Sequence, residues 1–366
     1  MTDKTAFAKF RTTAAQEIAG YDGGKPATPF TSTRWVASSL LQKAIRRGHL
    51  PAARQAGRFL LEGKREHLFR RLNGIAAEDI GLGDIQTMAI TAACLTSAKV
   101  RRELGGDVIV TDYLIRRMVN ARKSRAADDL LMVVERWPEL SGDRSRFFTM
   151  PNCRLRQIVL GCPSLERRAL ALWLLVGTER CPSQYLPRRK GSPDMAFATL
   201  ADLGVAPTLL TITRENFTKT ATMLSPFVAL LSLENGVAGT GVADDPIPVA
   251  TVINGIPSWA FDMHTRPGRT ALGRLLLRNA GMSAWAATSL PRTGRIQIAG
   301  ELLFRLEGQC LHRRSAGPVS IGLQKRWEVD CSGLPLDSLI FGMAALRDAM
   351  YELDAIRGEV VAEGAS

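Results

Sequence analysis

The sequence predicts a mainly α-helical protein. Apolar side chains recur at three- and four-residue steps through much of the chain, most clearly in residues 111–125 and 336–357. Residues that favour helix starts, such as Ser, Thr, Asp and Pro, precede many of these segments. Strand-like composition is confined to a few short stretches, which are 208–213, 248–253, 295–298 and 327–331.

Length and composition indicate two domains after a polar arm. A chain of 366 residues with 46% hydrophobic residues can bury more than one core. Residues 1–33 are polar and contain closely spaced Gly and Pro, so a flexible arm is expected there. We expect a helical bundle domain over 34–140 and a second, mainly helical domain with a few short strands over 151–366.

The first helices of the bundle are predicted from their end signals. Ser38 or Ser39 is expected to cap a helix that reaches about Arg47, and Pro51 fits the first turn of the next helix. That helix is expected to end near Gly63.

A third helix is predicted over 66–78, and Asp84 is expected to cap a fourth over 85–99. Between them, Glu78 and Asp79 are adjacent carboxylates. Successive side chains on a helix point about 100° apart, so this pair is poorly placed to share one ion. We therefore expect Glu78 and Asp79 to serve packing rather than catalysis.

Three later segments are also predicted to be helices from their apolar residues. Thr111 or Asp112 is expected to begin a basic amphipathic helix that runs to about Arg125. Residues 165–176 are strongly apolar and predict a core helix. The final helix, 336–357, has an apolar seam of fewer than three heptads, which favours an internal core edge and leaves self-association open.

The chain is strongly basic. It has 48 Lys and Arg against 35 Asp and Glu, a formal net charge of +13, and such a charge attracts polyanions. Clustered cations neutralise several phosphates together, so the clusters predict contact with nucleic acid, whereas a merely solvated basic surface is the alternative. The residues expected to contact nucleic acid are Lys43, Arg46, Arg47, Arg70, Arg71, Arg116, Arg117, Arg122, Lys123 and Arg125.

Residues 38–84 carry the most distinctive pattern, SSLLQKAIRRGHLPAARQAGRFLLEGKREHLFRRLNGIAAEDIGLGD. This block resembles the helical region behind the ATPase core of the replication-associated recombination AAA+ ATPases, the clamp-loader-like Rar/Mgs type. The matching positions are Ser39, Leu40, Lys43, Arg47, Gly48, Leu60, Leu61, Gly63, Arg70, Arg71, Leu72, Ala77, Glu78, Asp79, Ile80, Gly81, Leu82 and Asp84. The family's Gly-Glu-Asp-Pro is replaced by Gly63, Lys64, Arg65 and Glu66, and the similarity continues weakly to Trp137.

The ATPase that the resembling family carries has no counterpart in this sequence. No Gly-x-x-x-x-Gly-Lys-Ser/Thr phosphate loop occurs, and residues 1–37 are too few for a nucleotide-binding domain. The resemblance therefore implies the non-catalytic, collar-side half of such a protein. It implies DNA as a partner, together with a replication protein or a separate ATPase, and no cofactor is expected.

The sharpest candidate for catalysis lies at Asp262 and His264. On an extended strand, alternating residues share one face, so this carboxylate and imidazole could bind a metal or share a proton, and Arg266 and Arg269 would suit a phosphate. The alternative is a histidine hydrogen-bonded to a local acid to stabilise a turn. No second cluster with metal-ligand spacing supports a metal site.

Targeting and redox signals are weak. The N-terminal segment lacks the apolar run of a signal peptide, and no stretch of about 18 apolar residues suggests a membrane span. Six scattered cysteines include no Cys-x-x-Cys pair, as expected for buried thiols in a reducing cytoplasm.

These observations predict a cytoplasmic, non-catalytic DNA-binding accessory protein of DNA replication, recombination or repair. Two alternatives remain at this point. One is a metal-dependent, nuclease-like enzyme centred on Asp262 and His264, and the other is a structural assembly subunit that binds an acidic protein partner.

Overall fold

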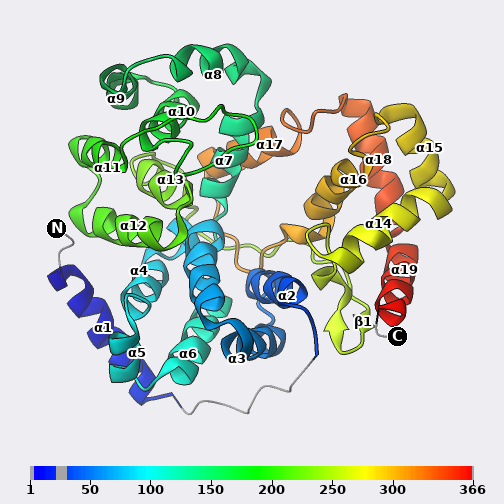
Figure 1. Cartoon of the computed structure of the whole chain (residues 1–366), viewed down its shortest axis with the longest axis horizontal. Helices are drawn as coiled ribbons and strands as arrows, with labels where there is room; N and C mark the ends of the chain where they lie inside the picture. Colours follow the sequence, from blue (N-terminus) through cyan, green and yellow to red (C-terminus); the bar gives the residue numbers. More distant parts are fainter. Residues whose placement is uncertain (1–3, 22–30, 365–366) are drawn as a thin grey trace. The chain divides into compact units, whose positions relative to one another are not determined.

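The structure is a computed structural model and describes residues 4–21 and 31–364. The predicted mainly α-helical fold is confirmed, because the described residues form 19 α-helices and a single two-stranded hairpin (Figure 1). The chain divides into two compact units. Unit 1 comprises Met1–Gly24, Phe69–Ala243 and Arg313–Cys331, and unit 2 comprises Lys25–Leu68, Asp244–His312 and Ser332–Ser366.

This division differs from the expected domains at 34–140 and 151–366. The stretch expected to separate them is occupied by α8 (Ser141–Phe148), inside unit 1. The difference arises because each unit combines segments that are distant in sequence. In unit 2, for example, Lys43 bonds the carbonyl of Trp259, 216 residues further along the chain.

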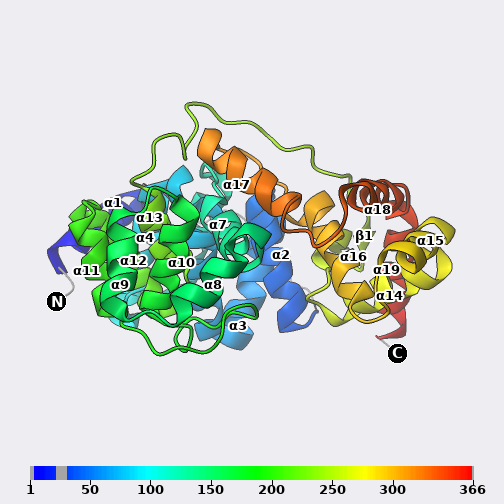
Figure 2. The same cartoon turned by 90° about the horizontal axis from the view of Figure 1, so that it is seen from above.

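Unit 1 is built around α10 (Leu165–Val176), as the apolar run predicted. Ala169 to Val176 are all buried, and α10 packs on α7, α8, α9, α11 and α13, which both views show gathered around it (Figures 1 and 2). The other helices of unit 1 are α1 (Lys4–Ala19), the end of α3 (Leu50–Ile75), α4 (Ile85–Cys94), α5 (Ala98–Glu103), α6 (Asp107–Asn120), α7 (Ala126–Arg136), α9 (Asn152–Gly161), α11 (Pro193–Asp202), α12 (Pro207–Thr220), α13 (Leu224–Leu231) and α17 (Pro318–Glu328).

Most of the short strands predicted from composition are helical instead. The 208–213 stretch lies in α12, where Pro207 occupies the first turn and Leu209, Ile212 and Phe217 are buried on one side. Trp327 lies near the end of α17, and 295–298 begins α16. Only 248–253 contains a strand, β1 (Val252–Ile253). Tertiary burial of apolar residues at helical spacing outweighs the local β-propensity of such short runs.

The segment expected to be a flexible arm contains helix α1. Phe7 and Ala14 are buried, and Arg11 donates to Thr96 Oγ1 at 3.0 Å. These contacts pack α1 on α4. The remainder of the expected arm, residues 22–30, lies outside the described residues.

Unit 2 has its core among five helices of the C-terminal part, α14 (Arg266–Arg278), α15 (Ala280–Ser289), α16 (Arg295–Leu303), α18 (Leu336–Asp348) and α19 (Met350–Glu363). Trp285 is fully buried at the centre of this cluster, which includes Leu346 and Leu353 of the predicted final seam. The seam is broken by Ala349 between α18 and α19.

Two N-terminal helices complete unit 2. Helix α2 (Arg34–Arg46) begins with Thr33, whose side chain accepts from the Val36 amide, rather than with Ser38 or Ser39 as expected. Helix α3 is interrupted at Lys64, which has non-helical torsion angles, so the predicted helix end near Gly63 is confirmed. In the hairpin, β1 pairs antiparallel with β2 (Ile256–Pro257), and Ile253 lies opposite Ile256.

Residues 77–84 fold around residues 121–125 within unit 1. Asp79 is fully buried, and its Oδ1 accepts from Arg125 Nη1 at 2.7 Å, while its carbonyl accepts from the Ser124 amide at 3.0 Å. Glu78 also pairs with Arg125. Both carboxylates thus contribute to packing, and the predicted cap of α4 by Asp84 is confirmed by its bond to the Thr87 amide at 2.9 Å.

No helix in the described ranges 4–21 and 31–364 is both long enough and apolar enough to cross a membrane.

Gly83 should be essential to the packing of 77–84. A Cβ at this position would lie 2.8 Å from the carbonyl oxygen of Arg122, closer than side chains approach backbone. We expect Gly83→Ala to lower the free energy of unfolding by about 1–3 kcal/mol through overpacking. Gly74→Ala is the control, because a Cβ there meets nothing within 4 Å, and it should raise stability by about 0.5–1 kcal/mol. Urea denaturation measures both, and equal effects would contradict the prediction.

Candidate nucleic-acid interface

The first predicted basic cluster is buried in unit 2. Lys43 is 4% exposed, and its Nζ bonds the Trp259 carbonyl at 2.6 Å and Asp262 Oδ2 at 2.8 Å. Arg46 donates to the Gly308 carbonyl, and Arg47 donates to the Glu307 carbonyl. The sequence interpretation of these three residues as a phosphate-contacting group is therefore wrong for this fold, since all three side chains are buried.

Lys123 and Arg125 are buried in unit 1 for a related reason. Helix α6 ends at Asn120 instead of continuing to 125, so the chain turns inward. Lys123 is fully buried, and its Nζ bonds the carbonyls of Val119 and Ala121 at 2.9 and 3.0 Å. Arg125 pairs with the acidic side chains of 77–84 and with Asp128. These two predicted DNA contacts are also corrected to core residues.

The remaining predicted residues reach the surface to different extents. Arg71 and Arg117 are half-buried, whereas Arg70, Arg116 and Arg122 are exposed. The three exposed arginines form no ion pair with a described residue. They are therefore the members of the predicted set whose charge is available to a ligand.

Neighbouring elements carry these three arginines and one more. Arg102 on α5 is likewise exposed and forms no ion pair in the described part of the chain. Helix α5 packs on α6, and Arg101 of α5 stacks on the ring of Phe69, the neighbour of Arg70 in α3, at 3.9 Å. Arg101 also pairs with Asp107, the first residue of α6, so α5 lies near the start of that helix, whereas Arg116 and Arg122 lie at its end. The available arginines are therefore distributed over α3 and both ends of α6.

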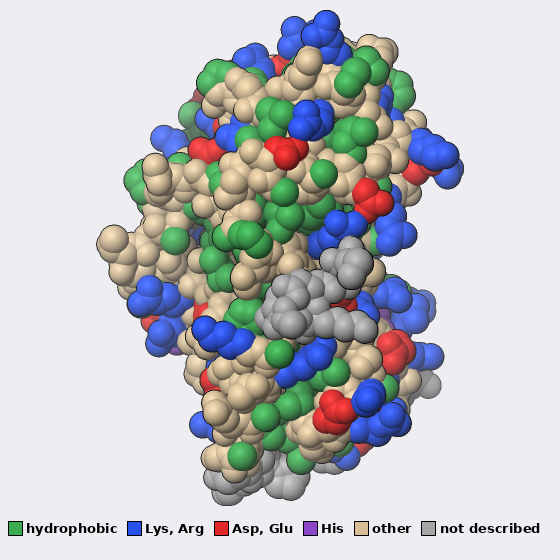
Figure 3. All heavy atoms as spheres, turned by 90° about the vertical axis from the view of Figure 1, so that its left-hand side faces the viewer, with side chains coloured by type: hydrophobic (Ala, Val, Ile, Leu, Met, Phe, Trp, Pro, Cys, Tyr) green, Lys and Arg blue, Asp and Glu red, His purple; other side chains and the backbone are tan. Residues whose placement is uncertain are grey.

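Basic side chains on the visible face of Figure 3 form separate groups. Acidic and hydrophobic side chains lie between them. A ligand on this face would therefore be held by individual arginines rather than by one continuous basic field.

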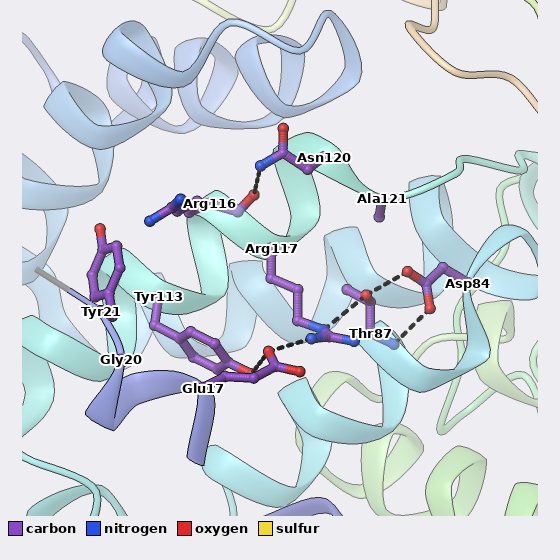
Figure 4. A pocket seen from close by; sticks show the side chains of 10 residues that line it. All are labelled: Glu17, Gly20, Tyr21, Asp84, Thr87, Tyr113, Arg116, Arg117, Asn120 and Ala121. Carbon is purple, nitrogen blue, oxygen red and sulfur yellow. Dashed lines mark hydrogen bonds and ion pairs between the residues drawn. The ribbon is translucent and has the colours of Figure 1, made fainter. Parts of the chain in front are cut away.

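A polar pocket of about 420 Å³ lies beside the exposed Arg116. It is formed by the end of α1, the start of α4 and the last two turns of α6 (Figure 4). Its lining residues are Glu17, Gly20, Tyr21, Asp84, Thr87, Tyr113, Arg116, Arg117, Asn120 and Ala121. We refer to it as the α1–α6 pocket.

Both acids of the α1–α6 pocket are satisfied by internal bonds. Glu17 accepts from Tyr113 Oη at 2.7 Å and pairs with Arg117. Asp84 accepts from the Thr87 amide and from Thr87 Oγ1, which in turn accepts from Arg117 Nε at 3.1 Å. Arg117 is therefore neutralised within this network, and it orders the pocket wall rather than supplying free charge.

Arg116 is held differently at the other end of the pocket. Its guanidinium lies over the ring of Tyr21, 5.0 Å from the ring centroid, and Figure 4 shows the two side by side. The hydroxyl of Tyr21 bonds Asp112. Burial raises the pKa of Asp112 to about 6, although the charge of Arg116 acts in the opposite direction.

The pocket was not predicted from the sequence. Arg116 and Arg117 were recognised as basic, but Glu17 and Tyr21 lie in the segment that we expected to be a flexible arm. The bonded pairs at the pocket are far apart in sequence: Tyr21 and Asp112 are 91 positions apart, and Glu17 and Arg117 are 100 positions apart. No local motif marks such a pair.

Asp262 and His264 do not form a shared site. Asp262 accepts from Ser39 Oγ at 3.0 Å, from Lys43 and from the backbone amide of His264 at 2.9 Å. The imidazole of His264 is exposed. The turn predicted at this point therefore uses the backbone of His264 rather than its ring, and Asp262 is the counterion of a buried lysine.

The electrostatics of Asp262 agree with this role. Burial, the largest single influence, would raise the pKa of its carboxyl group, but Lys43 and His264 together outweigh burial and lower that pKa to about 2. Within the described residues, no group of three or more His, Cys, Asp or Glu side chains is placed to hold a metal ion.

Comparison with known proteins identifies no relative: no family model, no curated protein and no solved structure matches this chain.

Asp262 and His264 should differ sharply in their effect on stability. We expect Asp262→Asn to lower the free energy of unfolding by about 3–5 kcal/mol, because it leaves Lys43 as an uncompensated buried charge. His264→Ala is the control from the same turn and should change stability by less than about 0.5 kcal/mol, because the ring is exposed. Urea denaturation followed by tryptophan fluorescence measures both.

The wild type should also lose stability in acid through Asp262. Its folded pKa of about 2 lies below the ordinary value of 3.8, so the stabilisation is present above 3.8 and is lost as the pH falls through about 2. This component should be absent from Asp262→Asn. A stable Asp262→Asn protein, or a strongly destabilised His264→Ala protein, would contradict the structural role assigned here.

Proposed function

We propose that this protein is a non-catalytic DNA-binding accessory protein of DNA replication, recombination or repair. Unit 1 would contact DNA phosphates through the exposed arginines at the ends of α3, α5 and α6. One observation carries the proposal: four exposed arginines form no ion pair with a described carboxylate. They are Arg70, Arg102, Arg116 and Arg122. Guanidinium groups bind phosphate through paired N–H donors, and several together give salt-dependent affinity.

The whole-chain charge supports a polyanionic ligand. Even though several cations are buried, the chain retains a formal net charge of +13, which raises the rate of encounter with DNA. The resemblance of residues 38–84 to recombination ATPases supports a role near replication or repair. In the resembling family an ATPase core accompanies this region, so an ATPase would supply any nucleotide-driven step.

The alternative enzyme centred on Asp262 and His264 has less support. A catalytic carboxylate needs access to substrate or metal, whereas Asp262 is occupied by Lys43, Ser39 and the His264 amide. Binding of an acidic protein through the same arginines remains the alternative that the DNA experiment addresses.

DNA binding should depend on salt and on the arginines at the end of α6. We expect the full chain to bind DNA without ATP, with log Kd changing with log salt by about 0.9 for each phosphate contacted on duplex. The double variant Arg116→Glu/Arg122→Glu should weaken binding and reduce that slope by about 2, one for each lost contact. Fluorescence anisotropy across a salt series measures both quantities.

Arg154→Glu/Lys190→Glu is the matched control, because it changes the net charge equally at two exposed positions elsewhere in unit 1. It should leave the slope nearly unchanged. Equal losses in both double variants would show that only overall charge matters. Absence of binding at low salt would reject the DNA proposal in favour of an acidic protein partner.

A further inference from the structure

We infer that the α1–α6 pocket holds one unpaired nucleotide, so that this protein prefers single-stranded DNA to duplex. The inference rests on the proposed DNA-binding function and specifies the nucleic-acid structure that this site would select. It is carried by the side chains that line the pocket and by how they are held, rather than by charge alone.

The position of Arg116 is the first observation. Its guanidinium carbon lies 5.0 Å from the centroid of the Tyr21 ring, in a cation–π contact, and the ring is itself held by the bond from its hydroxyl to Asp112. The side chain of Arg116 is exposed and forms no ion pair with a described residue. A planar guanidinium of this kind stacks on a nucleobase while its N–H edge bonds a phosphate or a base edge.

The chemistry of the other walls fits the same ligand. Asn120 donates its Nδ2 to the Arg116 carbonyl at 3.0 Å, and its side-chain oxygen accepts no bond from a described donor. This oxygen is suited to accept from an exocyclic base amino group. Glu17 and Asp84 are already bonded to Tyr113, Arg117 and Thr87. The positive charge of Arg116 is in no ion pair with a described residue, and the carboxyl group of Asp112 interacts with it at longer range.

The size of the pocket and the cost of unpairing a base together favour single-stranded DNA over duplex. A volume of about 420 Å³ lies in the range of about 300–1,000 Å³ that accommodates a ligand the size of a nucleotide. A base in a duplex is stacked and paired, so it must be flipped out before it can enter, which costs energy. A base in a single strand is already unpaired, so little of this cost arises. Stacking on aromatic and arginine side chains then stabilises the bound base.

The test compares two labelled probes with the full chain, a mixed-sequence 20-nucleotide single strand and the duplex of the same sequence. We expect wild type to bind the single strand about tenfold more tightly at equal salt, the scale of stacking one base. Arg116→Lys keeps the positive charge but loses the planar platform. It should lower affinity for the single strand more than affinity for duplex, so that most of the single-strand preference is lost.

Variants of Tyr21 provide a second test. Tyr21→Leu removes the aromatic support and should also reduce the preference, whereas Tyr21→Phe keeps the ring and should retain more of it. Arg154→Lys is the matched control and should leave the preference unchanged. Thermal unfolding of each variant checks that unit 1 remains folded. If Tyr21→Leu unfolds, Arg116→Lys still tests the inference, because it changes an exposed position.

Each outcome separates this inference from the proposed function. Salt-dependent binding with equal affinity for both probes would retain DNA binding and overturn the pocket assignment. A single-strand preference that survives Arg116→Lys and Tyr21→Leu would also overturn it. Binding to neither probe at low salt would reject the DNA function itself, and the inference with it.

Discussion

The need to pair buried cations shapes both units of this protein. An unpaired charge inside a protein is expensive, so each buried Lys or Arg requires acceptors around it. In unit 2, Arg357 is fully buried and bonds Asp354 at 2.8 Å and the Phe261 carbonyl at 3.0 Å, and it pairs with Glu307. Lys43 and Asp262 follow the same rule. These bonds connect α2 and α19 to the segment between the hairpin and α14.

The same constraint organises unit 1 around Arg125. Its guanidinium pairs with Glu78, Asp79 and Asp128, so residues 77–84 and the start of α7 are held by one side chain. Residues 38–84 thus contribute part of their charge to the interior, where Lys43, Arg46, Arg47 and Asp79 are buried, whereas Arg58, Glu62, Lys64, Arg65, Glu66 and Arg70 of the same block are exposed. For this reason, the buried Lys43, Arg46 and Arg47 carry less weight for the proposed DNA binding than their clustering suggested, and exposed arginines such as Arg70 carry more.

Helix α1 links folding to the candidate site. Its buried face packs on α4, while Glu17 near its end bonds Tyr113 and Arg117 of α6. Whereas Arg117 is neutralised, the adjacent Arg116 makes a cation–π contact with Tyr21 and is exposed. Consecutive arginines therefore have distinct roles, one in ordering the pocket wall and the other in presenting charge, because they project from different sides of the same helix.

The sequence by itself determined the local features of this protein. Apolar periodicity predicted the helical class and the core helix α10, and end signals located the break near Gly63 and the cap at Asp84, because these depend on interactions within a few residues. Only the tertiary structure decided which cations are buried and where the pocket forms. A partner such as Asp262 for Lys43 is supplied by a segment more than 200 residues away, and burial depends on such distant segments rather than on neighbouring sequence.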